Sequence, residues 1–166
     1  MPNTNVYRGS DGAIILSGEQ TQEGTMAQEV IDEYELTSVG RATNVTVEIT
    51  SELKPFHELG QRYPTELRPG NINITGTIER AYINGALLKL LLGKAATSRP
   101  AGTWVQPSFN IVLNLDNPAI PGTSNIITIH GVKFQNWSYG IPEDDFVLEK
   151  AKFMALWISV EDKQEG

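Results

Sequence analysis

The residues in this sequence that could support chemistry are two histidines, one run of three acids and three tryptophans. His57 and His130 lie far apart in the chain and lack the HxxxH or HxH spacing of a zinc site. Glu143, Asp144 and Asp145 could bind a cation, although three consecutive acids after a proline are more typical of a solvated turn. No nucleophile elbow, Walker loop or dinucleotide-binding motif is present. We therefore expect no enzymatic activity, no metal and no cofactor.

The tryptophans leave one binding function open. Trp104 and Trp137 could stack on sugar rings or bases, but Trp104 lies beside a predicted loop and Trp137 in a predicted strand. Trp157 also lies in a predicted strand, where core packing is the more common role of an aromatic side chain.

Composition limits the class of protein. The chain has 166 residues, which suits one domain, and no cysteine, which favours a reducing compartment and synthesis in the cytoplasm. No apolar run approaches the roughly 20 residues that cross a bilayer, so we expect no membrane insertion. With 20 acidic and 13 basic residues, the net charge of −7 argues against tight nucleic-acid binding but allows a protein that touches DNA without holding it.

Alternating apolar and polar residues predict a mainly antiparallel β-sandwich or half-barrel with one flanking helix. We expect a polar N-terminal arm over residues 1–27, a domain over 28–162 and a short tail over 163–166. We expect a bulge near Lys150 because the apolar parity changes there. The strands are predicted at 29–39, 43–50, 71–80, 109–115, 126–137 and 142–161.

Residues 71–93 change their period from strand-like to helical. Residues 86–92 are five leucines with Ala86 and Lys89, all of which favour a helix. We expect a short helix with Asn84 near its N-cap and Gly93 just past its end. Leu88 and Leu92 lie about 100° away from the stripe that would pack on the sheet. They therefore face a second surface, either a loop of the same chain or another subunit.

Residues 51–70 contain three prolines and two glycines, which predict a structured loop of functional length. Two segments around this loop carry a resemblance to a known family. The stretch ELGQRYPTELRPGNINITGTIERAYINGALLKLLLG, followed later by VKFQNWSYGIPEDDFVLEKAKFMALWISVED, resembles the tail tube proteins of tailed viruses, whose fold is shared with the tubes of contractile injection machines. The similarity in layout spans residues 28–162.

The resemblance implies a structural protein of the virion tail. Six copies would join their sheets edge to edge into a ring with a shared β-barrel, and the rings would stack into a conduit through which DNA passes without specific binding. Its partners would be further copies of itself, with the tail sheath, tape-measure, baseplate and terminator proteins as additional candidates. The arm would become ordered on stacking, and Leu88 and Leu92 would contact a neighbouring subunit. The loop would contact the next ring through Phe56, His57, Leu59, Arg62 and Tyr63.

The same picture assigns the polar faces of two strands to the channel. Because neither face has a lysine before Arg80, we expect a wall along which DNA slides. The candidates for this wall are Asn44, Thr46, Glu48, Thr50, Asn73, Thr75, Thr77 and Glu79.

The sequence leaves three alternatives open. The first is a ring-forming relative, such as a tail terminator, an initiator or an injection-system tube. The second is a carbohydrate- or ligand-binding β-sandwich that uses Trp104 and Trp137. The third is an enzyme that uses the acids from Glu143 to Asp145.

Overall fold

The computed structural model describes residues 7–35, 37, 39–102, 104–120 and 122–163. It confirms a mainly β protein, with seven antiparallel strands and, among the described residues, two α-helices rather than one. Residues 1–6 of the predicted arm and 164–166 of the predicted tail lie outside this part of the chain. The elements are β1 (Gly12–Gly18), α1 (Gln22–Glu33), β2 (Ala42–Phe56), β3 (Glu66–Ala81), α2 (Ala86–Leu92), β4 (Phe109–Asp116), β5 (Ser124–Gly140), β6 (Leu148–Ala155) and β7 (Trp157–Lys163), with short 3₁₀ helices at Gly9–Asp11 and Gly93–Ala96.

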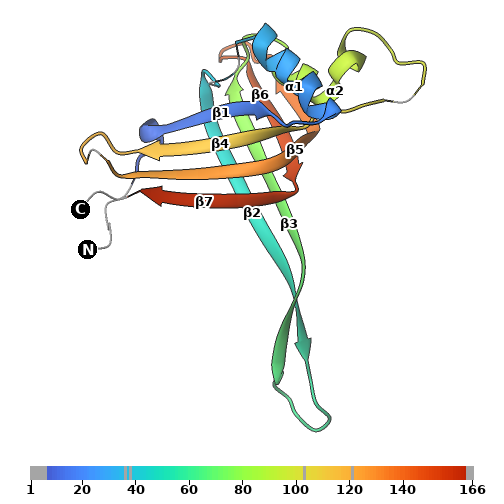
Figure 1. Cartoon of the computed structure of the whole chain (residues 1–166), viewed down its shortest axis with the longest axis vertical. Helices are drawn as coiled ribbons and strands as arrows, with labels where there is room; N and C mark the ends of the chain where they lie inside the picture. The colour runs from blue at the N-terminus through green and yellow to red at the C-terminus, as the bar shows by residue number, and fades with distance from the viewer. Residues whose placement is uncertain (1–6, 36, 38, 103, 121, 164–166) are drawn as a thin grey trace.

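The strands form two layers that share β5, and the order is β1-β4-β5-β6-β3-β2 with β7 also on β5. The short layer consists of β1, β4, β7 and residues 124–130 of β5, whereas the long layer consists of β2, β3, β6 and residues 133–140 of β5. The strands of the two layers cross at a steep angle, and the helices cover one end (Figure 1). The result is the curled half-barrel that the sequence predicts.

A glycine makes the corner at which β5 passes from one layer to the other. Gly131 has φ +67°, and a Cβ there would lie 2.5 Å from Leu156 Cδ1. Leu156 separates β6 from β7, and its N–H donates to the carbonyl of His130 at 2.9 Å. The corner therefore requires a residue that tolerates positive φ and has no side chain.

The core lies between the layers and beneath the helices. Phe109 and Phe134 contact each other with ring centroids 5.1 Å apart, and Phe153 is buried with them. Leu87 and Leu90 of α2 are also fully buried. Helix α2 thus packs its predicted stripe on the core, and Gly93 ends the helix with φ 60°, which confirms the expected C-terminus.

The N-terminal prediction was wrong in two respects. Residues 12–33 form β1 and α1, in place of an arm followed by a strand, and the expected domain boundary at residue 28 falls inside α1. The cause is a helical spacing that competes with the alternation in this segment, because Ala27, Val30 and Ile31 share a buried face. Thr21 caps the helix by accepting the N–H of Gly24 at 2.9 Å. Leu36 and Ser38 lie outside the described residues.

A contact between the helices fixes α1 beside α2. The Lys89 ammonium lies 5.1 Å from the centroid of the Tyr34 ring and donates to Glu33 Oε1 at 3.3 Å. Its hydrogen bond to the Tyr34 side chain, followed by that to Glu33, raises the pKa of Lys89. Lys89 therefore stays charged.

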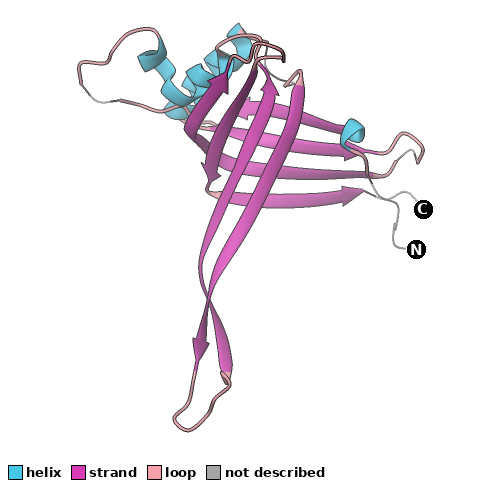
Figure 2. Cartoon of the chain, turned by 180° about the vertical axis from the view of Figure 1, so that it is seen from behind, coloured by secondary structure: helices cyan, strands magenta, loops and turns pink. Residues whose placement is uncertain are grey.

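The predicted loop over residues 51–70 is instead the outer part of a long hairpin. Strands β2 and β3 continue to Phe56 and from Glu66, and they project far beyond the rest of the molecule (Figure 2). Proline is compatible with these strands because each has a free side here, as an edge strand does: Pro55 pairs with Leu67 and Pro69 with Leu53. From here on, the arm means residues 51–72 of this hairpin, which are distinct from the N-terminal arm predicted over residues 1–27.

The last predicted strand is two strands. Leu156 separates β6 from β7, and no bulge occurs at Lys150, since Glu149, Ala151 and Phe153 alternate regularly as buried residues. Phe146 and Leu148, which suggested the change of parity, are exposed. Strand β7 ends at Lys163, the first residue of the predicted C-terminal tail.

Candidate assembly surfaces and the polar sheet face

The eight residues predicted to line a channel lie on one face of the long layer. In the β2–β3 register, Asn44 is opposite Glu79, Thr46 opposite Thr77, Glu48 opposite Thr75 and Thr50 opposite Asn73. Directly opposed side chains in an antiparallel pair point to the same face of the sheet. The structure therefore brings these residues together, on the side away from the core.

Strands β6 and β5 extend this face beyond what sequence reasoning found. The side chains opposite Thr77 and Glu79 on β6 are Lys152 and Lys150, and those opposite them on β5 are Asn136 and Ser138. We call the whole set the polar face. It consists of Asn44, Thr46, Glu48, Thr50, Asn73, Thr75, Thr77, Glu79, Lys133, Asn136, Ser138, Lys150, Lys152 and Met154.

The expectation of a face without lysine was wrong, because it rested on β2 and β3 alone. Lys150 and Lys152 are exposed on β6, between β3 and β5. Lys133, at the end of the face, pairs with Glu23 of α1 at 2.8 Å. The sequence places two lysines on one parity of β6 but does not reveal the neighbouring strand, so only the register could show that they share a face with Glu79.

Both edges of the long layer are open among the described residues. No strand pairs with the outer side of β2, and residues 133–140 of β5 pair with β6 on one side alone. The side chain of Gln106 donates to the Phe134 carbonyl on that free side. By contrast, the outer edge of β1 is covered, because Leu16 N–H donates to the Thr37 carbonyl and Val39 N–H to that of Ile14, each at 2.9 Å.

The direction of the strands makes the two open edges complementary. The order β5-β6-β3-β2 is antiparallel throughout, so β5 and β2 run in opposite directions. If copies are related by rotation about an axis along the layer, β5 of one copy meets β2 of the next as an antiparallel neighbour. Such a head-to-tail contact between different edges closes into a ring when the rotation divides a full turn.

The arm has one apolar and one polar face. After the bulge at residues 70–71, Leu53 lies opposite Pro69 and Pro55 opposite Leu67, on the side that continues the core. Leu53 is 58% exposed and Leu67 61%. The opposite face carries Lys54 opposite Arg68, whose guanidinium pairs with Glu66 at 3.2 Å. A two-stranded ribbon is marginal in water by itself, so this apolar face favours a covering partner.

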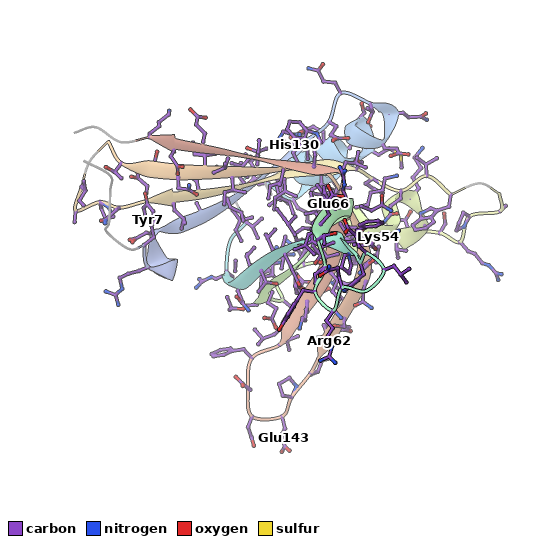
Figure 3. The ribbon with its side chains drawn as sticks, turned by 90° about the horizontal axis from the view of Figure 1, so that it is seen from below. Tyr7, Lys54, Arg62, Glu66, His130 and Glu143 are labelled. Carbon is purple, nitrogen blue, oxygen red and sulfur yellow. The ribbon has the colours of Figure 1, made fainter. Side chains whose placement is uncertain are left out.

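The predicted contact residues of the arm are at its tip and are exposed. Phe56, Leu59 and Tyr63 expose most of their surface, and Arg62 projects from the same turn (Figure 3). His57 is exposed beside them. Leu88 and Leu92 on α2 are half-buried, in contrast to fully buried Leu87 and Leu90. That the arm and α2 contact other copies of the chain is still a prediction.

The buried polar centre of the molecule lies beneath the polar face. Arg80 and Glu149 form an ion pair with both side chains buried. Trp137 Nε1 donates to the second oxygen of Glu149 at 2.9 Å, and the Arg80 guanidinium donates to the side chain of Asn84 at 3.1 Å. This network joins β3, β5 and β6 to the start of α2. Sequence reasoning missed it because alternation alone marks Arg80 as the end of a strand.

The candidate chemical residues do not converge. His57 is on the arm and His130 stacks on Trp157 with centroids 3.7 Å apart, and the described residues include no group of three acids or histidines that could hold a metal. Glu143, Asp144 and Asp145 lie in the exposed turn before β6.

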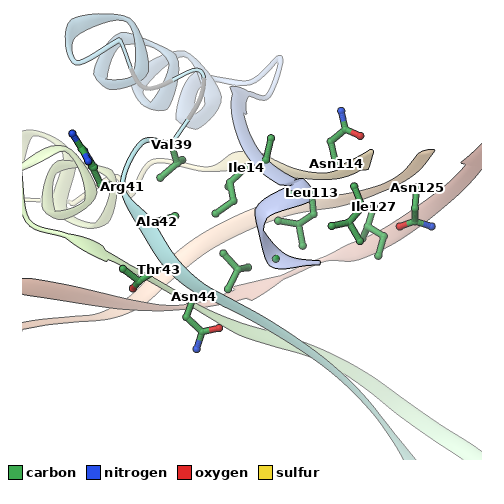
Figure 4. A pocket seen from close by; sticks show the side chains of 15 residues that line it. Ile14, Val39, Arg41, Ala42, Thr43, Asn44, Leu113, Asn114, Asn125 and Ile127 are labelled. Atoms are coloured by element: carbon green, nitrogen blue, oxygen red, sulfur yellow. The ribbon is translucent and has the colours of Figure 1, made fainter. Parts of the chain in front are cut away.

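The two tryptophans proposed for ligand binding also have other roles. Trp137 is partly buried and packs against the core. Trp104 Nε1 donates a hydrogen bond to the Leu92 carbonyl at 2.9 Å. The cavity of about 560 Å³ where the layers diverge is lined by aliphatic side chains such as Ile14, Val39 and Leu113 (Figure 4). Neither tryptophan lines it.

Within the described residues, no helix has the length and apolarity needed to span a membrane. No protein-family model matches the chain, and no curated protein matches it by sequence.

Solved structures match the fold over nearly its whole length. A sheath and tube terminator of the extracellular contractile injection system PVC covers 95% of this chain and 97% of its own, with 10% identity and a TM-score of 0.64. The sheath–tube complex of PVC covers 96% and 93%, with 9% identity and a TM-score of 0.65. The SPP1 tail tube covers 96% and 81%, with 8% identity and a TM-score of 0.60. The chain therefore has the fold shared by tubes of viral tails and of contractile injection systems.

Proposed function

We propose that this chain is a structural subunit of a viral tail tube, in which six copies form a ring and rings stack around a channel that delivers DNA to the host. The observation that carries the proposal is the pair of open edges on the long layer, which meet as antiparallel neighbours under rotation. Six pairings of β5 with β2 would satisfy the backbone groups of residues 133–140 that face outward, together with those of the β2 residues beside them, and give one continuous barrel. The polar face then lines the channel.

The arm supports stacking of rings along the channel. It runs parallel to the strands of the long layer and ends beyond β5 and β6, so it reaches the position of a ring above or below. Its apolar face, with Leu53 and Leu67, gains burial there at about 25 cal/mol per Å². Leu88 and Leu92 are proposed to contact a neighbour within the ring.

A second candidate is a ring that ends or starts a tube, or the tube of an injection system. It is favoured by the similarity to the PVC terminator and to the cap of the anti-feeding prophage, which covers 98% of this chain with a TM-score of 0.64. Both candidates place the chain in a particle, with further copies of itself as partners. Sheath, tape-measure, baseplate and terminator proteins remain proposed partners.

Electron microscopy of concentrated protein, followed by native mass spectrometry, tests the proposal. We expect rings with a central hole and a mass of six subunits, together with long filaments if the chain builds the tube itself. Isolated rings without filaments would favour the terminal-ring candidate. A protein that remains monomeric at high concentration would contradict both.

A further inference from the structure

The polar face differs in charge from the remainder of the molecule. Its charged side chains are those of Glu48, Glu79, Lys133, Lys150 and Lys152, which sum to +1. Since the chain carries −7, the residues outside this face carry −8. The surface proposed to line the channel therefore carries a small positive charge, although the rest of the chain is acidic.

Two of these lysines are available for a partner. Lys150 and Lys152 form no ion pair with any described residue, whereas Lys133 is held by Glu23. The side chains beside Lys152 on β3 and β5 are the neutral Thr77 and Asn136. Lys150 is opposite Glu79, whose carboxylate accepts a hydrogen bond from Asn44 Nδ2 at 3.2 Å.

Strand β6 holds both lysines on a fixed wall. It is paired on both sides, with β3 and with residues 133–140 of β5, and its opposite face is anchored by buried Glu149, Ala151 and Phe153. Residues two apart on a strand are separated by about 7 Å and point to one side. The two ammonium groups therefore form a short cationic track, flanked by hydroxyl and amide groups.

We infer that Lys150 and Lys152 contact the phosphate backbone of duplex DNA inside the channel, so that the wall grips its cargo weakly and in a salt-dependent manner. The inference rests on the proposed function, because ring closure repeats the track in every copy around the channel. Each lysine near a phosphate releases condensed counterions, and Glu48 and Glu79 limit the affinity. We favour DNA over an acidic polypeptide as the cargo because the charges of DNA are regularly spaced. An acidic polypeptide is the alternative cargo in the experiment.

The test uses assembled tubes, checked by electron microscopy, and a labelled 20-base-pair duplex titrated at several salt concentrations. We expect Lys150→Gln with Lys152→Gln to lower affinity roughly tenfold at low salt and to make the slope of log affinity against log salt shallower by about one to two. The matched control is Lys94→Gln with Lys163→Gln, which removes the same charge from exposed residues outside the polar face and should leave both quantities unchanged. Glu79→Gln should raise the affinity.

Different failures separate the inference from the proposed function. Wild-type protein that forms no rings overturns both. Tubes whose DNA affinity is equal in the Lys150/Lys152 and control variants overturn the inference alone, as do tubes that bind a poly-glutamate probe and not DNA. If the double variant does not assemble, Lys152→Gln alone can be measured in its place, and its affinity for the duplex should fall about threefold.

Discussion

Arg80 on β3 and Glu149 on β6 are directly opposed residues of neighbouring strands, and they form an ion pair that is closed off from solvent. The pair lies on the core side of the long layer, immediately behind the polar face. Because Glu149 also accepts from Trp137 on β5, three of the four strands of this layer are tied together at one point. The network therefore fixes the relative positions of the strands that carry Lys150 and Glu79.

We predict that Glu149→Gln destabilises the monomer strongly. The amide keeps the size of the side chain but removes its charge, which leaves the buried Arg80 guanidinium without compensation. The free energy of unfolding in urea should fall by roughly 3–5 kcal/mol. The control is Glu66→Gln, which breaks the exposed pair with Arg68 and should cost less than about 1 kcal/mol. Equal losses for both variants would contradict the structural role of the buried pair.

We also predict that Leu88→Glu with Leu92→Glu keeps the fold but prevents assembly. Both side chains are only half-buried in the single chain, so charging them leaves most of the core contacts of α2 in place. Circular dichroism and a urea titration should resemble those of the wild type, while ring formation in micrographs is lost.

The matched control changes the other side of the same helix. Leu87→Glu with Leu90→Glu introduces two charges into the core and should unfold the chain. If the Leu88/Leu92 variant unfolds in the same way, those leucines belong to the core, and another surface must mediate the contact.

Prolines at successive positions of β2 test the edge pairing. Along an edge strand, alternate N–H groups point toward β3 and outward, so Thr46→Pro and Val47→Pro remove one of each kind. One variant should lose a bond to β3 and about 1–3 kcal/mol of stability. The other should stay folded, apart from any packing lost at half-buried Val47, and form no rings, as judged by urea unfolding and micrographs. Normal rings from both variants would show that the outer edge of β2 is not an assembly surface.

Sequence reasoning succeeded where local pattern and tertiary contacts agree. Residues 71–93 show this well, because Ile74 and Ile78 are buried on β3 and Leu87 and Leu90 are buried on α2, as the change of period predicts. It failed for α1, where Glu29 to Tyr34 also fits an alternating strand and only packing decides the outcome.

Only part of the polar face could be predicted, because alternation shows which residues share a side of one strand but not which strands are neighbours. Thr46 and Thr77 could be placed on the polar sides of their own strands from alternation. Lys150 and Lys152 could not be assigned to the same face, since this requires knowing that β6 pairs with β3 across many intervening residues. The arm was mistaken for a loop because its prolines are strand-breaking inside a sheet but acceptable in a two-stranded ribbon.

The apolar face of the arm gives the sharpest test of stacking. We predict that Leu53→Ser with Leu67→Ser leaves the stability of the single chain within about 0.5 kcal/mol, because both side chains are exposed there. Rings should still form, since the edges of β2 and β5 in the body of the sheet are unchanged, but filaments should be replaced by single rings in sedimentation velocity and micrographs. The control, Glu52→Gln with Lys54→Gln, alters the opposite face and should keep filaments. Filaments of normal length from the leucine variant would exclude the apolar face from stacking, and loss of the rings themselves would place the arm between neighbours of one ring.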